Sequence, residues 1–346
     1  MTFQNTLINW YQIHKRDLPW RHTNDAYTIW LSEVILQQTR VEQGLPYFHK
    51  FLSNFPTVHH FAAASEVQVL KLWQGLGYYS RGRNMHATAQ IVVNHFDGIF
   101  PNGHDDLLKL KGIGEYTAAA ISSFSSGEAR AVVDGNVFRV LSRYYGIVTP
   151  INSPAGKKEF FKLANELLYL DDSALYNQAI MEFGAMQCKP KSPDCSVCPL
   201  NQSCFARLNN RVNELPVKIK KAAQKHRFMN YFICRRELEI IVRERQAGDI
   251  WQHLYDFPCI ETDNEMLDEH FLSGVKETFG QEADLSLINS KKHILTHQII
   301  HLRFFVLKNY IFNFSKQKEH MWVSLEKLDE LPQPKAIHDF INEYLH

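Results

Sequence analysis

The chain has 346 residues, of which 45% are hydrophobic, so it can form two domains or one large one with ordinary cores. No apolar run reaches the roughly 18 residues of a membrane-spanning helix, and the N-terminal segment lacks a signal-peptide pattern. The formal net charge of +1 neither requires nor excludes nucleic acid as a partner. The thiol usage and the lack of targeting indicate the cytosol.

The N-terminal part predicts helices. Tyr27, Trp30, Leu31, Val34 and Ile35 follow the spacing of an amphipathic helix, which Asp25 is placed to cap. Similar stretches follow at 62–73, 117–123, 137–145, 157–168 and 175–183. Strand-like alternation is scarce before residue 228.

Two apolar stretches over 107–118 flank a turn that contains Gly112 and Gly114. The glycines permit positive φ and close backbone approach, and the free N–H groups of the following helix can bind a phosphate. For a bare Gly-x-Gly an ordinary helix–turn–helix corner is the simpler interpretation.

Four of the six cysteines are clustered, with the spacing C-x6-C-x2-C-x5-C: Cys188, Cys195, Cys198 and Cys204. A disulfide framework belongs to small secreted domains, which this chain is not. Zinc is a serious alternative, but structural zinc sites usually pair two C-x2-C knuckles. The irregular spacing favours a [4Fe-4S] cluster with one cysteine per iron, held on a compact loop.

Beyond the cysteines the composition changes. Residues 213–224 are basic and polar and indicate a linker. Residues 231–235, 238–243, 301–307 and 321–323 are strand-like, and 335–345 predict a final helix. We therefore expect a mainly α domain over 1–212, a linker over 213–228 and a smaller α+β domain over 229–346.

The hairpin glycines in their L-x-G-I-G-x-x-T-A context, Asp134 and the four cysteines occur in the order typical of the endonuclease III superfamily, which this chain resembles. The resemblance implies a two-lobed helix-hairpin-helix glycosylase domain with a [4Fe-4S] cluster. It also implies DNA binding by Gly112 and Gly114, with Lys189, Lys191 and Arg207 presented to DNA by the cluster loop.

Within that superfamily, bifunctional members carry a nucleophilic lysine where this chain has Tyr116. A tyrosine cannot form a Schiff base, so we expect a monofunctional enzyme. Segments 18–21, 30–39 and 76–81 and the added C-terminal domain resemble the adenine DNA glycosylases of the MutY family. That resemblance implies a bacterial, nucleoid-associated monomer that removes adenine mispaired with 8-oxoguanine or guanine in double-stranded DNA.

The family resemblance assigns the chemistry to two carboxyl groups. Glu33 would be the general acid that protonates adenine, and Asp134 would stabilise the oxocarbenium-like sugar. Asn136 would position Asp134 or water, and Tyr116 would hydrogen-bond within the same site. Without that context, Glu33 is most simply a solvated helix residue, Asp134 a helix N-cap and Tyr116 a packing residue.

Adenine must leave the base stack to be reached. Gln37 and Tyr78 match family residues that insert near the lesion, although Tyr78 could instead pack in a core. Arg16 and Arg21 match positions near the adenine pocket, although each could be ordinary surface charge.

The second domain resembles Nudix proteins through residues 251–258, but it lacks the R-E-x-x-E-E box, so we expect no pyrophosphohydrolase activity. Many family members have Phe-Ser-His where this chain has Leu295, Thr296 and His297. Thr296 and His297 keep the polar groups that would contact 8-oxoguanine, whereas Leu295 lacks the aromatic ring.

Two other functions remain open from the sequence. One is a different monofunctional mismatch glycosylase, of the thymine–guanine type. The other is a non-catalytic iron–sulfur protein that binds mismatches, although the presence of both acidic residues argues against it.

Overall fold

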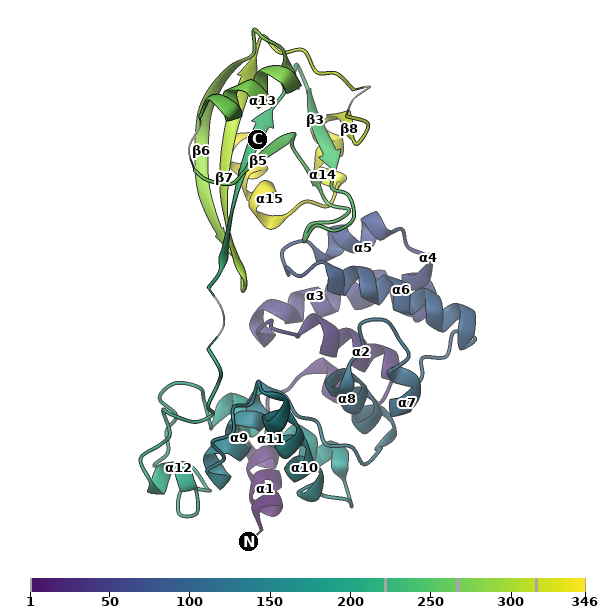
Figure 1. Cartoon of the computed structure of the whole chain (residues 1–346). Helices are drawn as coiled ribbons and strands as arrows, with labels where there is room; N and C mark the ends of the chain where they lie inside the picture. Colours follow the sequence, from purple (N-terminus) through teal and green to yellow (C-terminus); the bar gives the residue numbers. More distant parts are fainter. Residues whose placement is uncertain (1, 221–222, 266–267, 315–316, 346) are drawn as a thin grey trace. The chain divides into compact units, whose positions relative to one another are not determined.

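The computed structural model describes residues 2–220, 223–265, 268–314 and 317–345. It contains two compact units, one formed by Met1–Ala63 with Asn84–Lys220 and the other by Ala64–Arg83 with Lys221–His346. The order of elements agrees with the predicted fold class: a mainly helical N-terminal part is followed by a smaller part that contains sheets and helices (Figure 1). The exact domain boundaries stay a prediction.

The first unit is built from helices. They are α1 (Phe3–His14), η1 (Pro19–Arg21), α2 (Ala26–Ile35), α3 (Val41–Asn54), α4 (Val58–Ala63), the end of α6 (Ser80–His95), α7 (His104–Leu107), α8 (Glu115–Ser126), α9 (Gly135–Tyr145), α10 (Pro154–Glu166), α11 (Ser173–Met186) and α12 (Phe205–Leu208). No helix in the described part of the chain is long and apolar enough to cross a membrane.

Two packed groups of helices make up this unit. In one, α2 lies against α8, and Trp30 is fully buried between Phe61 and Phe100. In the other, α11 packs on α1 and α9 around Phe160 and Phe183. The end of α2 and the start of α9 belong to different groups of helices, and side chains from both line one cavity.

The local signals explain the helix limits. Asp25 caps α2 as predicted, because its carboxylate accepts the Thr28 N–H at 2.8 Å. The single amphipathic stretch expected over 62–73 is wrong: Ser65 and Gln68 form a capping box that starts α5 (Glu66–Trp73) separately from α4.

The second unit contains α5 and two sheets. The strands are β1 (Lys225–Ile233), β2 (Arg235–Arg236), β3 (Glu239–Glu244), β4 (Tyr255–Asp256), β5 (Cys259–Thr262), β6 (Asp284–Ile294), β7 (Gln298–Lys308) and β8 (His320–Ser324). The larger sheet has the order β5-β1-β7-β6, with β1 and β7 parallel. In the smaller sheet β3 pairs with β2, β4 and β8.

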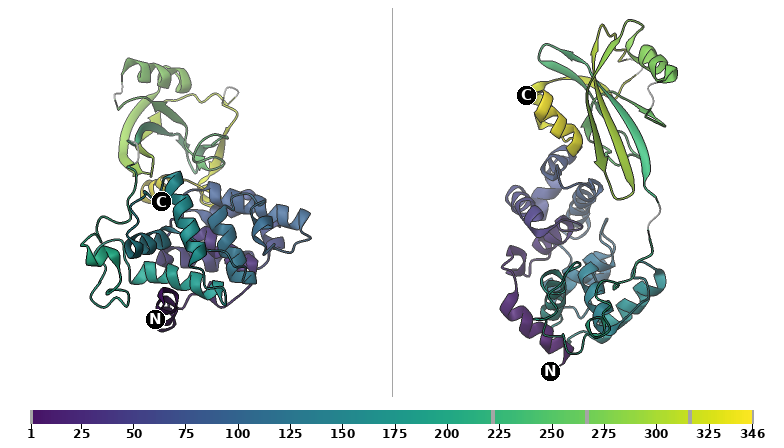
Figure 2. Two further views of the ribbon diagram at one scale, coloured as in Figure 1. Left: turned by 60° about the horizontal axis from the view of Figure 1, so that its bottom comes forward. Right: turned by 90° about the vertical axis from the view of Figure 1, so that its left-hand side faces the viewer.

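Helices lie on both faces of the larger sheet, as the right-hand view of Figure 2 shows. Phe271 of α13 (Glu269–Phe279) packs with Phe232 and Phe305 on one face. Phe340 of α15 (Lys335–Tyr344) stacks on Phe304 on the other face, with ring centroids 3.9 Å apart. The short helix α14 (Leu325–Glu330) follows β8.

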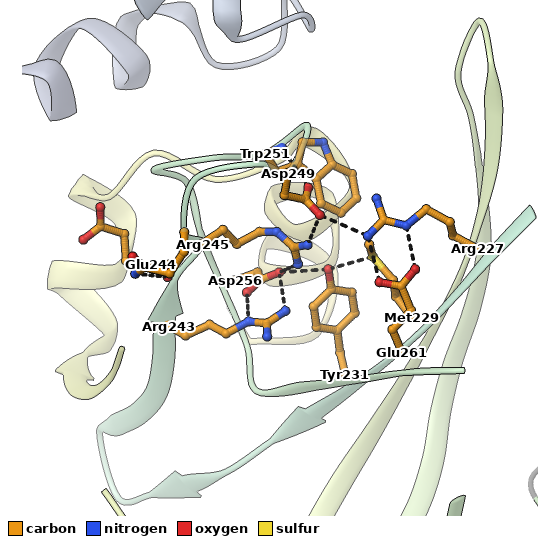
Figure 3. Close-up of polar contacts among 11 residues, drawn as sticks. Arg227, Met229, Tyr231, Arg243, Glu244, Arg245, Asp249, Trp251, Asp256 and Glu261 are labelled. Atoms are coloured by element: carbon orange, nitrogen blue, oxygen red, sulfur yellow. Dashed lines mark hydrogen bonds and ion pairs between the residues drawn. The ribbon is translucent and has the colours of Figure 1, made fainter. Parts of the chain in front are cut away.

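A buried ion-pair network ties the two sheets together (Figure 3). Asp256 of β4 accepts hydrogen bonds from Arg243 at 2.8 Å, from Arg245 at 2.7 Å and from the Tyr231 hydroxyl at 2.9 Å. Asp256 is almost fully buried, and these donors replace the water that its carboxyl group has lost. Asp256 lies in the 251–258 segment, which therefore has a structural role in this domain.

Candidate active site

Glu33 lies on α2 and is buried rather than solvated. Its side chain is 9% exposed, and its Oε2 accepts a hydrogen bond of 2.7 Å from the Tyr116 hydroxyl in the first turn of α8. Burial raises the pKa of Glu33 to about 7, and the negative charge of Asp134 adds to that rise while the Tyr116 hydrogen bond opposes it. Near neutral pH this carboxyl group is therefore partly protonated and can donate a proton.

Asp134 is both the N-cap of α9 and a wall of the same site. Its Oδ1 accepts the backbone N–H groups of Asn136 and Val137, each at 2.8 Å, and its Oδ2 accepts the Asn136 side-chain amide at 2.6 Å. Burial raises the pKa of Asp134 and these hydrogen bonds oppose the rise. The capping interpretation and a catalytic role are thus compatible.

These side chains share one cavity of about 700 Å³. Glu33, Tyr116, Asp134 and Asn136 line it, and apolar walls come from Leu18, Trp20, Leu36 and Met181. The four residues predicted to be catalytic are thereby brought together by α2, α8 and α9. Gln37, predicted to insert into DNA, also lines the cavity and donates to the Thr117 hydroxyl at 3.2 Å.

Arg16 and Arg21 are part of the cavity wall, and an acidic residue that the sequence analysis missed holds them there. Glu182 is 1% exposed and accepts the two guanidinium groups at 2.7 Å each. Burial acts to raise the pKa of Glu182, but the hydrogen bonds from Arg16 and Arg21 outweigh it and lower the pKa to about 2.

Gln178, one turn before Glu182 on α11, accepts a hydrogen bond of 3.1 Å from Arg21 and also lines the cavity. The amphipathic pattern of α11 carried no signal for either residue, because a polar side chain on such a helix is normally solvated.

The cysteine loop is connected to α9 by two arginines. Arg139 donates to the Asn136 side-chain oxygen and to the Cys188 carbonyl oxygen, each at 2.7 Å. Arg143, one turn later, donates to the Cys188 sulfur at 3.4 Å and to the Lys189 carbonyl oxygen at 2.8 Å. Hydrogen bonds therefore extend from Asp134 through α9 to the loop.

All four clustered cysteines are unpaired and line one small cavity together with Arg143 and Arg207. Four thiols around one cavity, with a buried cation beside them, fit an anionic cluster with one cysteine per iron. No three His, Cys, Asp or Glu side chains among the described residues are gathered as ligands of a single metal ion. A cluster that takes one thiolate per iron does not need that geometry.

The turn between α7 and α8 contains the positive φ angle that its glycines predict. Gly112 has φ of +81°, and a Cβ there would lie 2.9 Å from the Asn84 side chain, so both conformation and space require glycine. Gly114 caps α8 through its backbone with no side-chain cap bond. The first N–H groups of α8 have no partner from a cap and are suited to a phosphate.

Comparison with known proteins identifies both domains. Residues 31–167 match the HhH-GPD superfamily of base excision DNA repair proteins, and residues 230–343 match the NUDIX domain. The chain is 32% identical over 346 residues to the adenine DNA glycosylase of Buchnera aphidicola subsp. Baizongia pistaciae, covering 99% of this chain and 97% of that protein. The chain belongs to the adenine DNA glycosylase family.

Solved structures agree with this adenine DNA glycosylase assignment at the level of the fold. A thermostable thymine-DNA glycosylase has a TM-score of 0.56 and 28% identity, covering 60% of this chain and 95% of that one. An endonuclease III–DNA complex has a TM-score of 0.52 at 20% identity, covering 61% of this chain and 99% of that one.

Tyr78 and Thr296, both in the second unit, are brought together, and their hydroxyl groups contact each other. Tyr78 is 42% exposed, so it does not pack in a core. His297 is exposed, and its carbonyl oxygen accepts the Lys225 N–H at 3.1 Å. Tyr78, expected to insert near the lesion, thus contacts Thr296, one of the two residues expected to meet 8-oxoguanine, and the other, His297, is exposed.

Proposed function

We propose that the chain removes adenine from double-stranded DNA in which adenine is paired with 8-oxoguanine or guanine, by a monofunctional hydrolytic mechanism. The observation that carries this proposal is a buried carboxyl group, Glu33, with a pKa of about 7 in the same cavity as Asp134. Two carboxyl groups in different environments can take different roles.

Glu33 would act as the general acid. Adenine is a poor leaving group, so N7 must accept a proton as the glycosidic bond breaks, and Glu33 holds one near neutral pH. Tyr116 would orient the carboxyl group through its hydrogen bond. Once deprotonated, Glu33 would accept a proton from the attacking water.

Asp134 would stabilise the positive sugar that adenine leaves behind. The hydrogen bonds from Asn136 and the start of α9 keep this carboxylate fixed and oppose its protonation. A fixed negative charge in a cavity of low dielectric stabilises an oxocarbenium-like transition state more than a mobile, solvated charge does.

A base in a 700 Å³ cavity between packed helices cannot remain in a duplex, so the reaction would need base flipping. Trp20 and Leu36 would contact the flat faces of the adenine, while Gln178 and the Glu182-bound Arg21 offer polar groups for its edge. Gln37 would support the strand from which the base has left.

Recognition of the opposite base would use Tyr78, Thr296 and His297. The first two already share a hydroxyl contact, and all three polar ends are accessible. Leu295 can contribute apolar contact here but no aromatic stacking.

Cys188, Cys195, Cys198 and Cys204 would hold a [4Fe-4S] cluster, with Arg143 beside it. When bound, the cluster supplies a rigid cross-link for the loop that meets DNA. Gly112 and Gly114 would bind a DNA phosphate through the start of α8.

Single-turnover assays on duplexes with adenine opposite 8-oxoguanine, adenine opposite guanine and thymine opposite guanine test this function. We expect release of adenine from the first two, no release of thymine, and no borohydride-trapped protein–DNA adduct. Release of thymine would assign the chain to the thymine–guanine type, and binding without release of any base would make it a non-catalytic mismatch binder.

A further inference from the structure

Tyr78 has a backbone conformation that bulky residues rarely adopt. It lies in the turn that joins α5 to α6 (residues 74–79, the Tyr78 turn), and its φ angle is +46°, in the left-handed region. Gly75 and Gly77 in the same turn have φ of +102° and +71°, which glycine adopts without strain. A tyrosine with positive φ costs free energy and persists only where its surroundings hold it. The contacts around the turn therefore decide where the Tyr78 ring lies.

The Arg81 side chain reaches back from α6 to this turn. Its Nη2 donates to the carbonyl oxygens of Leu76 and Gly77, each at 3.3 Å. Its Cζ lies 5.8 Å from the centroid of the Tyr78 ring and 5.0 Å from that of the buried Trp73 ring. Both distances are within the range of a cation–π interaction. One cation thus contacts the backbone that precedes Tyr78 and the ring of Tyr78 itself.

Hydrogen bonds fix the peptide groups on both sides of Tyr78. The Gly77 carbonyl oxygen, in the peptide group before Tyr78, accepts the Trp73 Nε1–H at 3.0 Å as well as the Arg81 Nη2–H. The Tyr78 carbonyl oxygen, in the peptide group after it, accepts the Arg81 backbone N–H at 2.9 Å. Because φ and ψ of a residue relate its two peptide groups, these bonds hold Tyr78 in its left-handed conformation.

The two ends of the Tyr78 turn are attached elsewhere in the same unit. The Tyr79 hydroxyl donates to the Gln333 carbonyl oxygen at 3.0 Å, and the backbone N–H of Gln333 donates to the Gln74 side-chain oxygen at 3.0 Å. Gln333 is fully buried, so this attachment is rigid. It fixes the flanks of the turn, whereas the direction of the Tyr78 side chain depends on the contacts of Arg81 and on the hydroxyl contact with Thr296.

The helix that carries Arg81 does not by itself favour a cation there. Arg81 is the second residue of α6, and a positive side chain in the first turn of a helix is unfavourable with the helix dipole. Its side chain is half-buried. Burial lowers the pKa of Arg81 to about 10, and Tyr78 opposes that fall, so the guanidinium stays charged near neutral pH. Contact with the carbonyl oxygens and rings of the turn compensates for this unfavourable position.

We propose that Arg81 is a positioning residue that holds Tyr78 ready for the lesion duplex, so that preference for the lesion depends on Arg81 through Tyr78 alone. This inference rests on the role proposed above for Tyr78 in recognising the base opposite adenine. A side chain that is already fixed before DNA binds loses less conformational freedom on binding, which increases affinity.

Hydrogen exchange in the DNA-free, full-length protein tests the structural step by itself. Arg81→Met removes the charge and the donors but keeps an unbranched side chain, so the peptide 74–81 should exchange faster than in wild type. Arg83→Met is the matched control, because Arg83 is in the same helical turn but donates to the Gln252 carbonyl oxygen at 2.8 Å. It should leave the exchange of this peptide unchanged. Equal exchange in wild type and Arg81→Met would overturn the proposal.

A double-mutant cycle tests the step through Tyr78. Affinity is measured for a duplex with non-cleavable 2′-fluoroadenosine opposite 8-oxoguanine and for a fully paired duplex. Arg81→Met should reduce the preference for the lesion duplex about tenfold, and Arg81→Lys, which keeps the cation, should lose less. In a Tyr78→Leu background, Arg81→Met should cause no further loss. The same loss in both backgrounds would mean that Arg81 contacts DNA directly and would contradict the proposal.

The same measurements separate failure of this inference from failure of the proposed role of Tyr78. Loss of lesion preference in Tyr78→Leu but not in Arg81→Met would overturn the inference and leave the role of Tyr78 intact. Unchanged preference in Tyr78→Leu would overturn that role and this inference with it.

Discussion

The hydrogen bond between Tyr116 and Glu33 makes a prediction about the pH dependence of excision. Glu33 must hold its proton to act as an acid, so the single-turnover rate should fall as pH rises through about 7. Tyr116→Phe removes the 2.7 Å hydrogen bond, which stabilises the ionised carboxylate and lowers its pKa. A hydrogen bond to a charged group contributes about 1.5–3 kcal/mol, or about 1–2 pKa units.

The alkaline midpoint of excision should therefore move upward by about one pH unit in Tyr116→Phe. Rates are measured under single turnover from pH 5 to 9.5 on a duplex with adenine opposite 8-oxoguanine. Tyr27→Phe is the control. Tyr27 is a buried tyrosine on α2, the helix that carries Glu33, and its hydroxyl donates to the Phe55 carbonyl oxygen and not to Glu33. A midpoint that stays in place or falls in Tyr116→Phe, or one that moves equally in Tyr27→Phe, would refute the reasoning.

Three further predictions concern stability and the cluster. Burial raises the pKa of Glu33 from 4.5 to about 7, so the protonated carboxyl group stabilises the fold fully below about pH 4.5 and this contribution is lost as pH rises to about 7. In denaturant melts, the free energy of unfolding of Glu33→Gln should therefore rise by about 3 kcal/mol relative to that of wild type between pH 4.5 and 7. The pH dependence is opposite for Glu182, because its pKa is lowered to about 2. Glu182→Gln should lower the free energy of unfolding by about 3 kcal/mol above pH 4.5, and this loss should shrink as pH falls toward 2. Arg143→Ala should reduce the iron content per chain, measured by a colorimetric iron assay, whereas the exposed Arg130→Ala should not, because Arg143 contacts the Cys188 sulfur and the loop.

Much of the architecture was accessible from the sequence because its signals are local. The period of α2, its cap at Asp25 and the change to strand-like alternation after the cysteines each depend on residues a few positions apart. The split between α4 and α5 was missed because the apolar period continues across Ser65. β6 was missed because it is an edge strand with mostly exposed side chains on both faces, so no apolar alternation marks it.

The site was predictable where residues carry a family pattern and not where tertiary contacts decide. Glu33, Tyr116 and Asp134 lie in segments that resemble known motifs, yet their convergence depends on how α2, α8 and α9 pack. Glu182 had no signal, because a glutamate on an amphipathic helix becomes a buried anchor only when Arg16 and Arg21 arrive from another part of the chain.

The most direct test of the central claim, that Glu33 is the acid that releases adenine, is a comparison of wild type with Glu33→Gln. Affinity for a duplex with adenine opposite 8-oxoguanine and the single-turnover rate of adenine release are measured on the same preparations. We predict unchanged binding and loss of release in Glu33→Gln, since glutamine keeps the shape and the Tyr116 hydrogen bond but has no acidic proton. Release of adenine by Glu33→Gln at a rate near that of wild type would contradict the account.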